Sequence, residues 1–318
     1  MRIKKAFSLI EVVFVLIILG IVASIASQII VQVYENYIIQ RAIYKVSTKT
    51  ELVANQIVNR LTYRIQGTTI SKNHIQIRNG QPLQWLPIQD VPTGGTTYTS
   101  IEWIGYDNDS FSSSVNPNWS GVANYETATV NKFETVDSNL STVATIMSNL
   151  SGGKVNLSKN APAGVLFIQN DNYYNGSNEY NPICMGMIPE LASSTTDCIF
   201  PVTMSGDNDF NFTTTPAHPA IVPKIITERY KLAWSAYAIA PEDPDGDGRF
   251  DLVLFSNYQP WNGDSYLDAN VTRHILMKNV SVFKFSENGG VIRFKLCATE
   301  PIGTDNNIST CKEKVVIK

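Results

Sequence analysis

The sequence predicts an α+β protein in which one very long amino-terminal helix packs on an antiparallel β-sheet domain. From about Phe7 to Gln66, apolar residues follow a helical period, with no proline before Pro82 and Gly20 as the only glycine in that stretch. After Gly67 the period falls to about two, and short runs rich in Ile, Val, Phe and Trp alternate with turn residues, which is typical of antiparallel strands. With 318 residues, of which 43% are hydrophobic, the chain can bury a substantial core.

The first half of the helix is predicted to cross a membrane. No charged residue occurs from Val12 to Val33, about 22 residues, which is enough to span a bilayer as a helix. Three basic residues precede this run, so the amino end is expected in the cytoplasm and the rest of the chain outside. The run is longer than the apolar region of a cleaved secretory signal. A plain membrane anchor, the second alternative, leaves Glu11 without a role.

The second half of the helix is predicted to be amphipathic. Its apolar residues recur at helical spacing between polar ones: Ile39, Ile43, Val46, Val53, Ile57, Leu61 and Ile65. One helix over residues 7–66 would be roughly 90 Å long. A plain anchor does not need this half, and we expect it to pack on the β-sheet.

The opening stretch KKAFSLIEVVFVLIILGIVA resembles the class III leader and first helix of the type IV pilin and pseudopilin family. That pattern is a short basic leader, a small residue, Phe, and Glu at the fifth position of the mature chain. The resemblance implies a pilin-like fold and a leader over residues 1–6. It also implies that a prepilin peptidase cuts after Ala6 and makes Phe7 the new amino terminus. The family usually has Gly before the cut, and Ala6 departs from that pattern. Ala is also small, so we expect the peptidase to cut here, but more slowly.

The same resemblance gives Glu11 a role in assembly. An ionised carboxylate within a membrane helix costs about 2.5–3.5 kcal/mol at the bilayer centre and less near the interface. In the family, this cost is offset when a neighbouring subunit places its free amino terminus beside the carboxylate. Phe7 of one subunit would then pair with Glu11 of another. The alternative is an acid that merely extends towards the membrane interface.

The resemblance also implies partners and a location. The partners are the prepilin peptidase, other pilins or pseudopilins, the inner-membrane assembly platform and membrane lipid. The chain is expected to cross the bacterial inner membrane once, with its globular domain periplasmic, or extracellular after assembly. VANQIVNRLTYRIQ, followed by a large β-rich domain, resembles the larger minor pseudopilins, in particular the J-type of type II secretion and its pilus counterparts. This finer assignment rests on length and general layout.

Residues 67–318 are predicted to form the β-rich domain. Two hairpins are expected, one turning at Asn79–Gly80 within HIQIRNGQPLQWLPI and one at Asn288–Gly290. SIEWIGY, AGVLFIQ, ITERYKLAWSAYAIA and FDLVLFS are further expected strands. Between the first two of these, residues 107–160 are rich in Asn, Ser and Thr and show little periodicity. We expect a surface insertion there, with one short helix over residues 137–150.

An acidic loop, EDPDGDGRFD, is a candidate calcium site. Hard carboxylate oxygens on a tightly curled backbone suit this cation, and the loop offers the aspartates at alternate positions that occur in an EF-hand: Asp243, Asp245, Asp247 and Asp251. The carbonyl of Arg249 is a further expected ligand, whereas Leu254 occupies the position of the usual bidentate Glu. Another acid would complete the shell: Glu242, Asp264 or Asp268. The alternative is a solvated acidic turn, and magnesium is less favoured because it takes fewer protein ligands.

Four cysteines are expected to form disulfides if the chain is exported: Cys184, Cys198, Cys297 and Cys311. Neither neighbouring pair has the short spacing of a zinc or redox motif. Pairing within each neighbouring pair is the simplest of three possible connectivities, and each closed loop would stabilise by roughly 3 kcal/mol.

The sequence favours a structural subunit over an enzyme. Its three histidines are far apart in the sequence. No segment resembles a nucleophile elbow, a zinc-protease helix or a phosphate-binding glycine loop. The formal charge of −3 gives no basic face for nucleic acid. We therefore expect a minor pseudopilin or minor pilin that acts in assembly initiation or a tip complex. The alternative is a pilus-tip binding module, an adhesin or DNA-uptake pilin, that uses the Asn-rich insertion. A membrane-anchored, calcium-using hydrolase would need an acid pair in a cleft.

Overall fold

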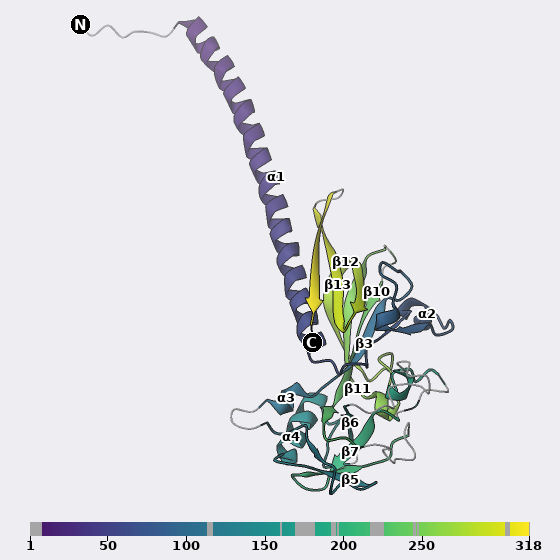
Figure 1. The fold of residues 1–318 in the computed structure, drawn as a ribbon. Coiled ribbons are helices and arrows are strands. Elements are labelled where there is room, and N and C mark those ends of the chain that lie inside the picture. Colours follow the sequence, from purple (N-terminus) through teal and green to yellow (C-terminus); the bar gives the residue numbers. More distant parts are fainter. Residues whose placement is uncertain are drawn as a thin grey trace, which may run out of the picture.

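The computed structural model describes residues 8–112, 117–159, 161–168, 182–191, 195, 197–216, 226–243, 246, 248–302 and 306–317. Ala6, Phe7, Asp245 and Asp247 lie outside these residues. The helix α1 (Leu9–Thr62) projects from a β-rich body that carries the carboxyl end, and its amino-terminal half stands clear of that body (Figure 1). The α+β architecture predicted from the sequence is confirmed.

Among the described residues, the strands form two antiparallel sheets. The larger has eight strands in the order β14-β13-β12-β11-β10-β3-β1-β2. These strands are β1 (Ile70–Lys72), β2 (Trp85–Pro87), β3 (Ser100–Gly105), β10 (Ser235–Glu242), β11 (Phe250–Tyr258), β12 (Thr272–Asn288), β13 (Val291–Ile302) and β14 (Asn306–Val316). The long β12–β13 hairpin turns at Gly289 and Gly290, whose positive φ angles of 59° and 81° favour glycine. The predicted hairpin at this place is confirmed.

The smaller sheet has six described strands in the order β4-β5-β8-β7-β6-β9. They are β4 (Ala123–Asn124), β5 (Lys132–Thr135), β6 (Ala163–Phe167), β7 (Phe200–Met204), β8 (Asp209–Phe212) and β9 (Tyr230–Ala233). The described helical segments of the body are α2 (His74–Arg78), α3 (Asn108–Phe111), α4 (Leu140–Ser151), and the short 3-10 turns η1 (Ile88–Asp90), η3 (Pro182–Met185) and η4 (Pro260–Asn262). The smaller sheet lies at the end of the body remote from the amino terminus (Figure 1).

Residues 107–160 form more than a surface insertion, because they supply β4, β5 and α4 to a separate buried core. Phe133 is fully buried there and contacts Phe167, Phe210 and Tyr230, with ring centroids 5.3–5.4 Å apart. The helix expected over residues 137–150 is α4, and the side chain of Asn139 caps its first turn by accepting from the Thr142 amide at 3.1 Å.

One predicted hairpin strand is wrong. Residues 74–78, expected to pair across an Asn79–Gly80 turn, form the short helix α2 instead. The Asn73 side chain starts this helix by accepting from the Gln76 amide at 3.2 Å. The strands that do pair are β1 and β2, with Lys72 opposite Trp85. A local helix cap has therefore overridden the alternating apolar pattern.

We expect the free energy of unfolding to depend on pH because of Asp107, a buried residue that precedes α3. Burial raises the pKa of Asp107 from 3.8 to about 7 despite a hydrogen bond from the Ser110 amide. The folded chain then keeps a proton that the unfolded chain loses, so stability should fall as pH rises from about 4 to beyond 7. Asp107→Asn should remove that fall, on the order of a few kcal/mol. Urea unfolding at pH 5 and pH 8 measures the free energy of unfolding of the wild type and of Asp107→Asn. An equal pH dependence in the two proteins would contradict a raised pKa of Asp107.

Candidate assembly and metal sites

The carboxylate of Glu11 lies in the first turn of α1. Ser8 caps the helix: its Oγ accepts from the Glu11 amide at 3.3 Å, while Glu11 Oε2 accepts from the Ser8 amide at 3.0 Å. Ser8 Oγ lies 3.1 Å from the same oxygen. This reciprocal arrangement is a capping box, which stabilises the helix start. Both residues are exposed, so the carboxylate is accessible to a partner.

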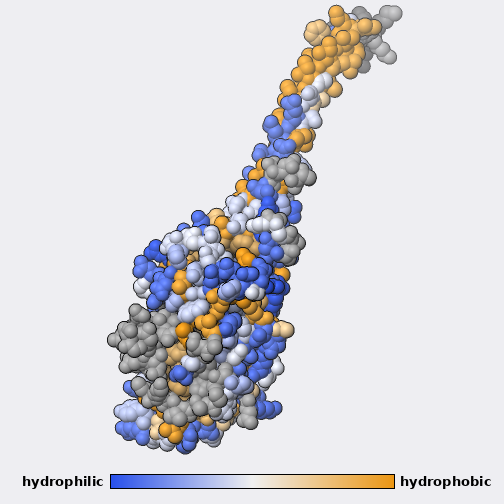
Figure 2. All heavy atoms as spheres, turned by 90° about the vertical axis from the view of Figure 1, so that its right-hand side faces the viewer, coloured by the Kyte–Doolittle hydropathy of each residue, from blue (hydrophilic) through white to orange (hydrophobic). Residues whose placement is uncertain are grey.

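Exposed apolar side chains surround Glu11 and continue along the amino-terminal half of α1, which is called the upper half below. Leu9 is 85% exposed and Phe14 63% exposed, and the same surface extends to Val33. Figure 2 shows this end of the molecule as hydrophobic and the body as largely mixed or hydrophilic. By length and composition, α1 can cross a membrane. Glu11 is the acidic residue of the first turn of α1, and it lies at the amino-terminal end of this long apolar surface.

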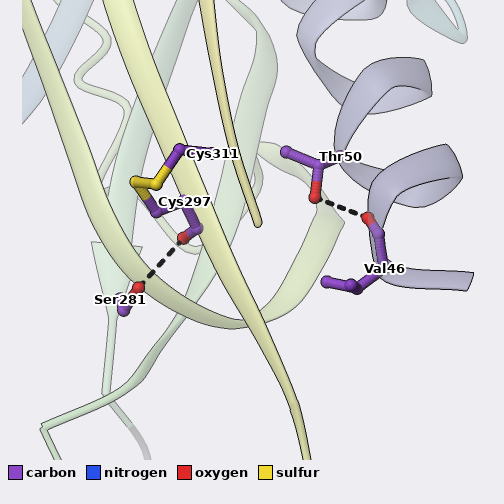
Figure 3. The surroundings of a disulfide bond; sticks show 5 residues. All are labelled: Val46, Thr50, Ser281, Cys297 and Cys311. Carbon is purple, nitrogen blue, oxygen red and sulfur yellow. Dashed lines mark hydrogen bonds between the residues drawn. A yellow bond between two sulfur atoms is a disulfide. The ribbon is translucent and has the colours of Figure 1, made fainter. Parts of the chain in front are cut away.

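The carboxy-terminal half of α1, called the lower half below, packs on β12, β13 and β14. It does so through a stripe of buried residues: Ala42, Val46, Thr50, Val53, Ala54, Ile57 and Leu61. Thr50 satisfies its hydroxyl by donating to the Val46 carbonyl at 2.7 Å (Figure 3). Two residues predicted on this face, Ile39 and Ile43, are instead 40% and 44% exposed. The buried stripe begins at Ala42, which is where α1 meets the body.

Ion pairs and one buried arginine fix α1 to the larger sheet. Glu51 pairs with Lys314 and Lys312 of β14, and the hydrogen bond from Lys314, opposed by desolvation, lowers the pKa of Glu51. Lys45 pairs with Glu300 of β13. At the helix end, Arg64 donates to the Leu61 carbonyl at 2.9 Å and to the Gly290 carbonyl at 2.8 Å. Arg64 thereby joins the end of α1 to the β12–β13 turn.

Both neighbouring cysteine pairs form disulfides. Cys184 joins Cys198, with Cα atoms 5.2 Å apart, and Cys297 joins Cys311, with Cα atoms 4.0 Å apart. The second pair links directly opposed residues of β13 and β14 (Figure 3). The simplest of the three possible connectivities is thus the one found.

The acidic loop connects β10 to β11. Asp243 follows the last residue of β10, and Asp251 is the second residue of β11, opposite Glu242. Asp243 accepts from the Gly246 amide at 2.7 Å, and Gly246 and Gly248 have positive φ angles of 69° and 80°, which favour glycine. Asp251 Oδ2 lies 3.5 Å from the exposed Lys278. Within the described part of the chain, no three His, Cys, Asp or Glu side chains gather as a metal site. Arg249 lies immediately before β11, and the role of its carbonyl as a ligand stays a prediction.

The acids considered as completing ligands already have partners. Glu242 pairs with both Arg78 and Arg273. Burial disfavours its charge, yet the hydrogen bond and charge of Arg273, with the charge of Arg78, hold the pKa of Glu242 below its ordinary value. Asp264 accepts from the Gln259 amide at 3.1 Å, and Asp268 accepts from the Ser265 amide at 2.8 Å.

Sequence reasoning missed two groups of polar residues. Ser8 was detectable, because Ser followed three residues later by Glu at the start of an apolar run is the signature of a capping box. The buried group formed by Lys72, Glu102 and Tyr258 had no detectable sequence pattern, because its members come from three strands that are far apart in the sequence.

Comparison with known proteins gives one match. A family model described as the prokaryotic N-terminal methylation motif matches residues 1–27. Comparisons with curated proteins and with solved structures returned no match. The leader and the apolar helix that follows it indicate a membrane-anchored chain with a single amino-terminal span. Residues 1–27 thus carry the methylation motif of class III prepilins, and this leader fits a member of the type IV pilins and pseudopilins.

Proposed function

We propose that this chain is a minor pseudopilin or minor pilin, a structural subunit of a type II secretion pseudopilus or a type IV pilus. The observation that carries the proposal is the position of Glu11: an accessible carboxylate in the first turn of an exposed apolar helix, within the matched methylation motif. Such a carboxylate is costly in lipid and gains most from a cationic partner. We place the subunit in the initiating or tip complex, since its large two-sheet body suits an end better than a repeating position.

Assembly would exchange contacts within one subunit for contacts between subunits. In the single chain, Glu11 accepts hydrogen bonds from Ser8. In a filament, the free amino group of Phe7 from a neighbour would approach the same carboxylate, while the apolar surfaces of α1 pack together inside. The body would face outward, and an external machine would supply the work.

The mass of the amino-terminal peptide, taken from membranes of the native host, tests this function. We expect a peptide that begins at Phe7 and carries one added methyl group, despite Ala6 before the cut. Such processing provides the free amino terminus that the pairing with Glu11 requires. A peptide that retains Met1 to Ala6 would overturn the proposal and leave a simple membrane-anchored domain.

A pilus-tip binding module is the second candidate, because α4 and β5, which belong to the predicted insertion, lie at the end remote from the amino terminus (Figure 1). The β4–β5 region also exposes apolar side chains, including Tyr125 at 61% and Val130 at 55%. An adhesin would lose attachment to its target surface when both are replaced by serine, yet would still enter filaments. A minor subunit without a binding role would keep both properties.

We also propose that the loop from Asp243 to Asp251 binds calcium as a structural ion. The positive φ angles of Gly246 and Gly248 and the spacing of the aspartates in the sequence support this. Calcium at a hundredfold excess over Kd should stabilise the folded chain by about 2.7 kcal/mol. The measurement is the melting temperature with calcium, with magnesium and with chelator.

Asp243→Asn should weaken the calcium response, and Asp209→Asn in β8 is the matched control that should retain it. Metal analysis of the purified chain gives an independent readout. Equal melting temperatures with calcium and with chelator, together with no bound metal, would leave the loop as a solvated acidic turn.

A further inference from the structure

A lysine and a glutamate meet in the interior of the larger sheet. Lys72 of β1 is fully buried and Glu102 of β3 is 1% exposed, and Lys72 Nζ lies 2.9 Å from Glu102 Oε2. They occupy one face of the sheet as diagonal neighbours, since Lys72 pairs with Ser100 and Ile70 with Glu102. Apart from their contact with each other, Lys72 Nζ and Glu102 Oε2 make no hydrogen bond to any described residue. An amine and a carboxyl group are therefore held in contact, and the two facing atoms, Nζ and Oε2, are only partly satisfied for a buried ion pair.

The surroundings of this pair contain the groups that amide formation requires. The Tyr258 hydroxyl donates to Glu102 Oε1 at 2.9 Å, so it polarises the carboxyl group from the oxygen remote from Lys72. A second carboxylate, Glu190, lies with its Oε2 3.6 Å from Lys72 Nζ, and its Oε1 accepts from Ser265 Oγ at 3.3 Å. The Glu190 side chain is 27% exposed, which connects the buried pair to solvent.

We propose that Lys72 and Glu102 join spontaneously in the folded chain to form an intramolecular isopeptide bond, with Glu190 as the proton-transferring carboxylate. This bond would cross-link β1 to β3 covalently. The site takes no external substrate, cofactor or oxidant, because both reacting groups belong to the chain.

The bond forms with a balanced exchange of atoms. A proton moves from the Lys72 ammonium to Glu102 Oε2 and leaves a neutral amine beside a neutral carboxylic acid. Nζ attacks Glu102 Cδ, and the electron pair of the Cδ–Oε1 double bond moves to Oε1, where the Tyr258 hydroxyl stabilises it. Glu190 takes a proton from Nζ and delivers one to Oε2, which leaves as water while the Cδ–Oε1 double bond forms again. Glu190 ends as it began, and the net products are one amide and one water.

Burial provides the driving force. In water, the ionised amine and carboxylate are stable and the amide hydrolyses, but the interior penalises both charges. Burial also raises the pKa of Glu102, against the lowering influence of Lys72, which favours the neutral acid that the attack needs. The amide replaces two buried charges with one neutral group, and Oε1 as its carbonyl keeps the hydrogen bond from Tyr258.

The test is the intact mass of the mature full-length chain, purified in detergent with its cysteines reduced. We expect a mass one water lower than the full sequence mass, which is calculated here for the amino terminus and the methylation actually found on the chain. Digestion with trypsin should fail after Lys72 and should release the Lys72 peptide joined to the Glu102 peptide. A folded wild-type chain, with both disulfides formed before reduction, that has the full sequence mass would overturn the proposal.

Two variants separate this bond from water loss elsewhere. Lys72→Met should restore the full sequence mass, and a deficit that persists in it would contradict the assignment to Lys72. Glu190→Gln retains Lys72 and Glu102, and its partly exposed position favours normal folding. We expect this variant to carry the full mass when freshly folded, with any loss of water far slower than in the wild type. Complete cross-linking at the wild-type rate would exclude Glu190 as the proton carrier.

Discussion

Replacing Glu11 with alanine is expected to prevent entry of the chain into filaments while it still inserts in the membrane. The substitution removes an acid that costs up to about 2.5–3.5 kcal/mol in lipid, so insertion should become easier. It also removes the counter-charge for the amino group of a neighbouring Phe7. The measurement compares the chain in sheared filament fractions with the chain in membranes, and we expect the filament share to fall at least about tenfold, the effect of about 1.4 kcal/mol.

Ser8→Ala is the matched control for that substitution, because Glu11→Ala also destroys the capping box. Loss of the Ser8 cap costs about 1 kcal/mol of helix stability but leaves the Glu11 carboxylate in place. Filament entry should therefore persist in Ser8→Ala. If both variants fail to assemble to the same degree, the capping of α1 explains the defect and the charge pairing does not.

Phe133→Ala is expected to lower the free energy of unfolding of the smaller sheet by about 3–5 kcal/mol. Phe133 is fully buried and contacts aromatic rings from β6, β8 and β9. Its loss would leave a cavity in the centre of this core. Urea unfolding, followed by the fluorescence of Trp119 and Trp234 in the same core, measures the effect.

The control is Tyr125→Ala, which removes an aromatic ring that is 61% exposed on the neighbouring β4–β5 region. It should change the unfolding free energy by less than about 0.5 kcal/mol, as is usual for surface positions. Similar small changes in both variants would mean that residues 107–160 add little to the stability of the body.

Local patterns were sufficient to predict the helix and the carboxy-terminal hairpin. The helical period persists from Leu9 to Thr62, and the β12–β13 hairpin joins strands separated only by a glycine turn. Glu11 was identifiable for the same reason, since its motif is contiguous. The exposed positions of Ile39 and Ile43 could not be predicted, because periodicity identifies a face but not where the body begins to cover it.

Of the smaller sheet, β6 and β9 lie in segments that were predicted as strands, but the other strands and the pairing were not predictable, because the pairing is non-local and the strands are short. β5 pairs with β8, so Phe133 lies opposite Phe210 across a long separation in sequence. The surrounding Asn, Ser and Thr residues obscure a period that only two to five residues carry in each strand. The contact between Lys72 and Glu102 likewise depends on how β1 meets β3, which no spacing in the sequence specifies.

The β13–β14 hairpin lies lengthwise along the lower half of α1, and this arrangement decides how the subunit would bear mechanical load. A pull along the helix axis loads the interface in shear, so the ion pairs of Lys45 and Glu51 and the Arg64–Gly290 hydrogen bond share the force in parallel. The Cys297–Cys311 bond prevents the two strands from peeling apart one residue at a time. Force applied to the helix therefore passes into the whole larger sheet, and the body should stay folded while α1 is pulled from a membrane.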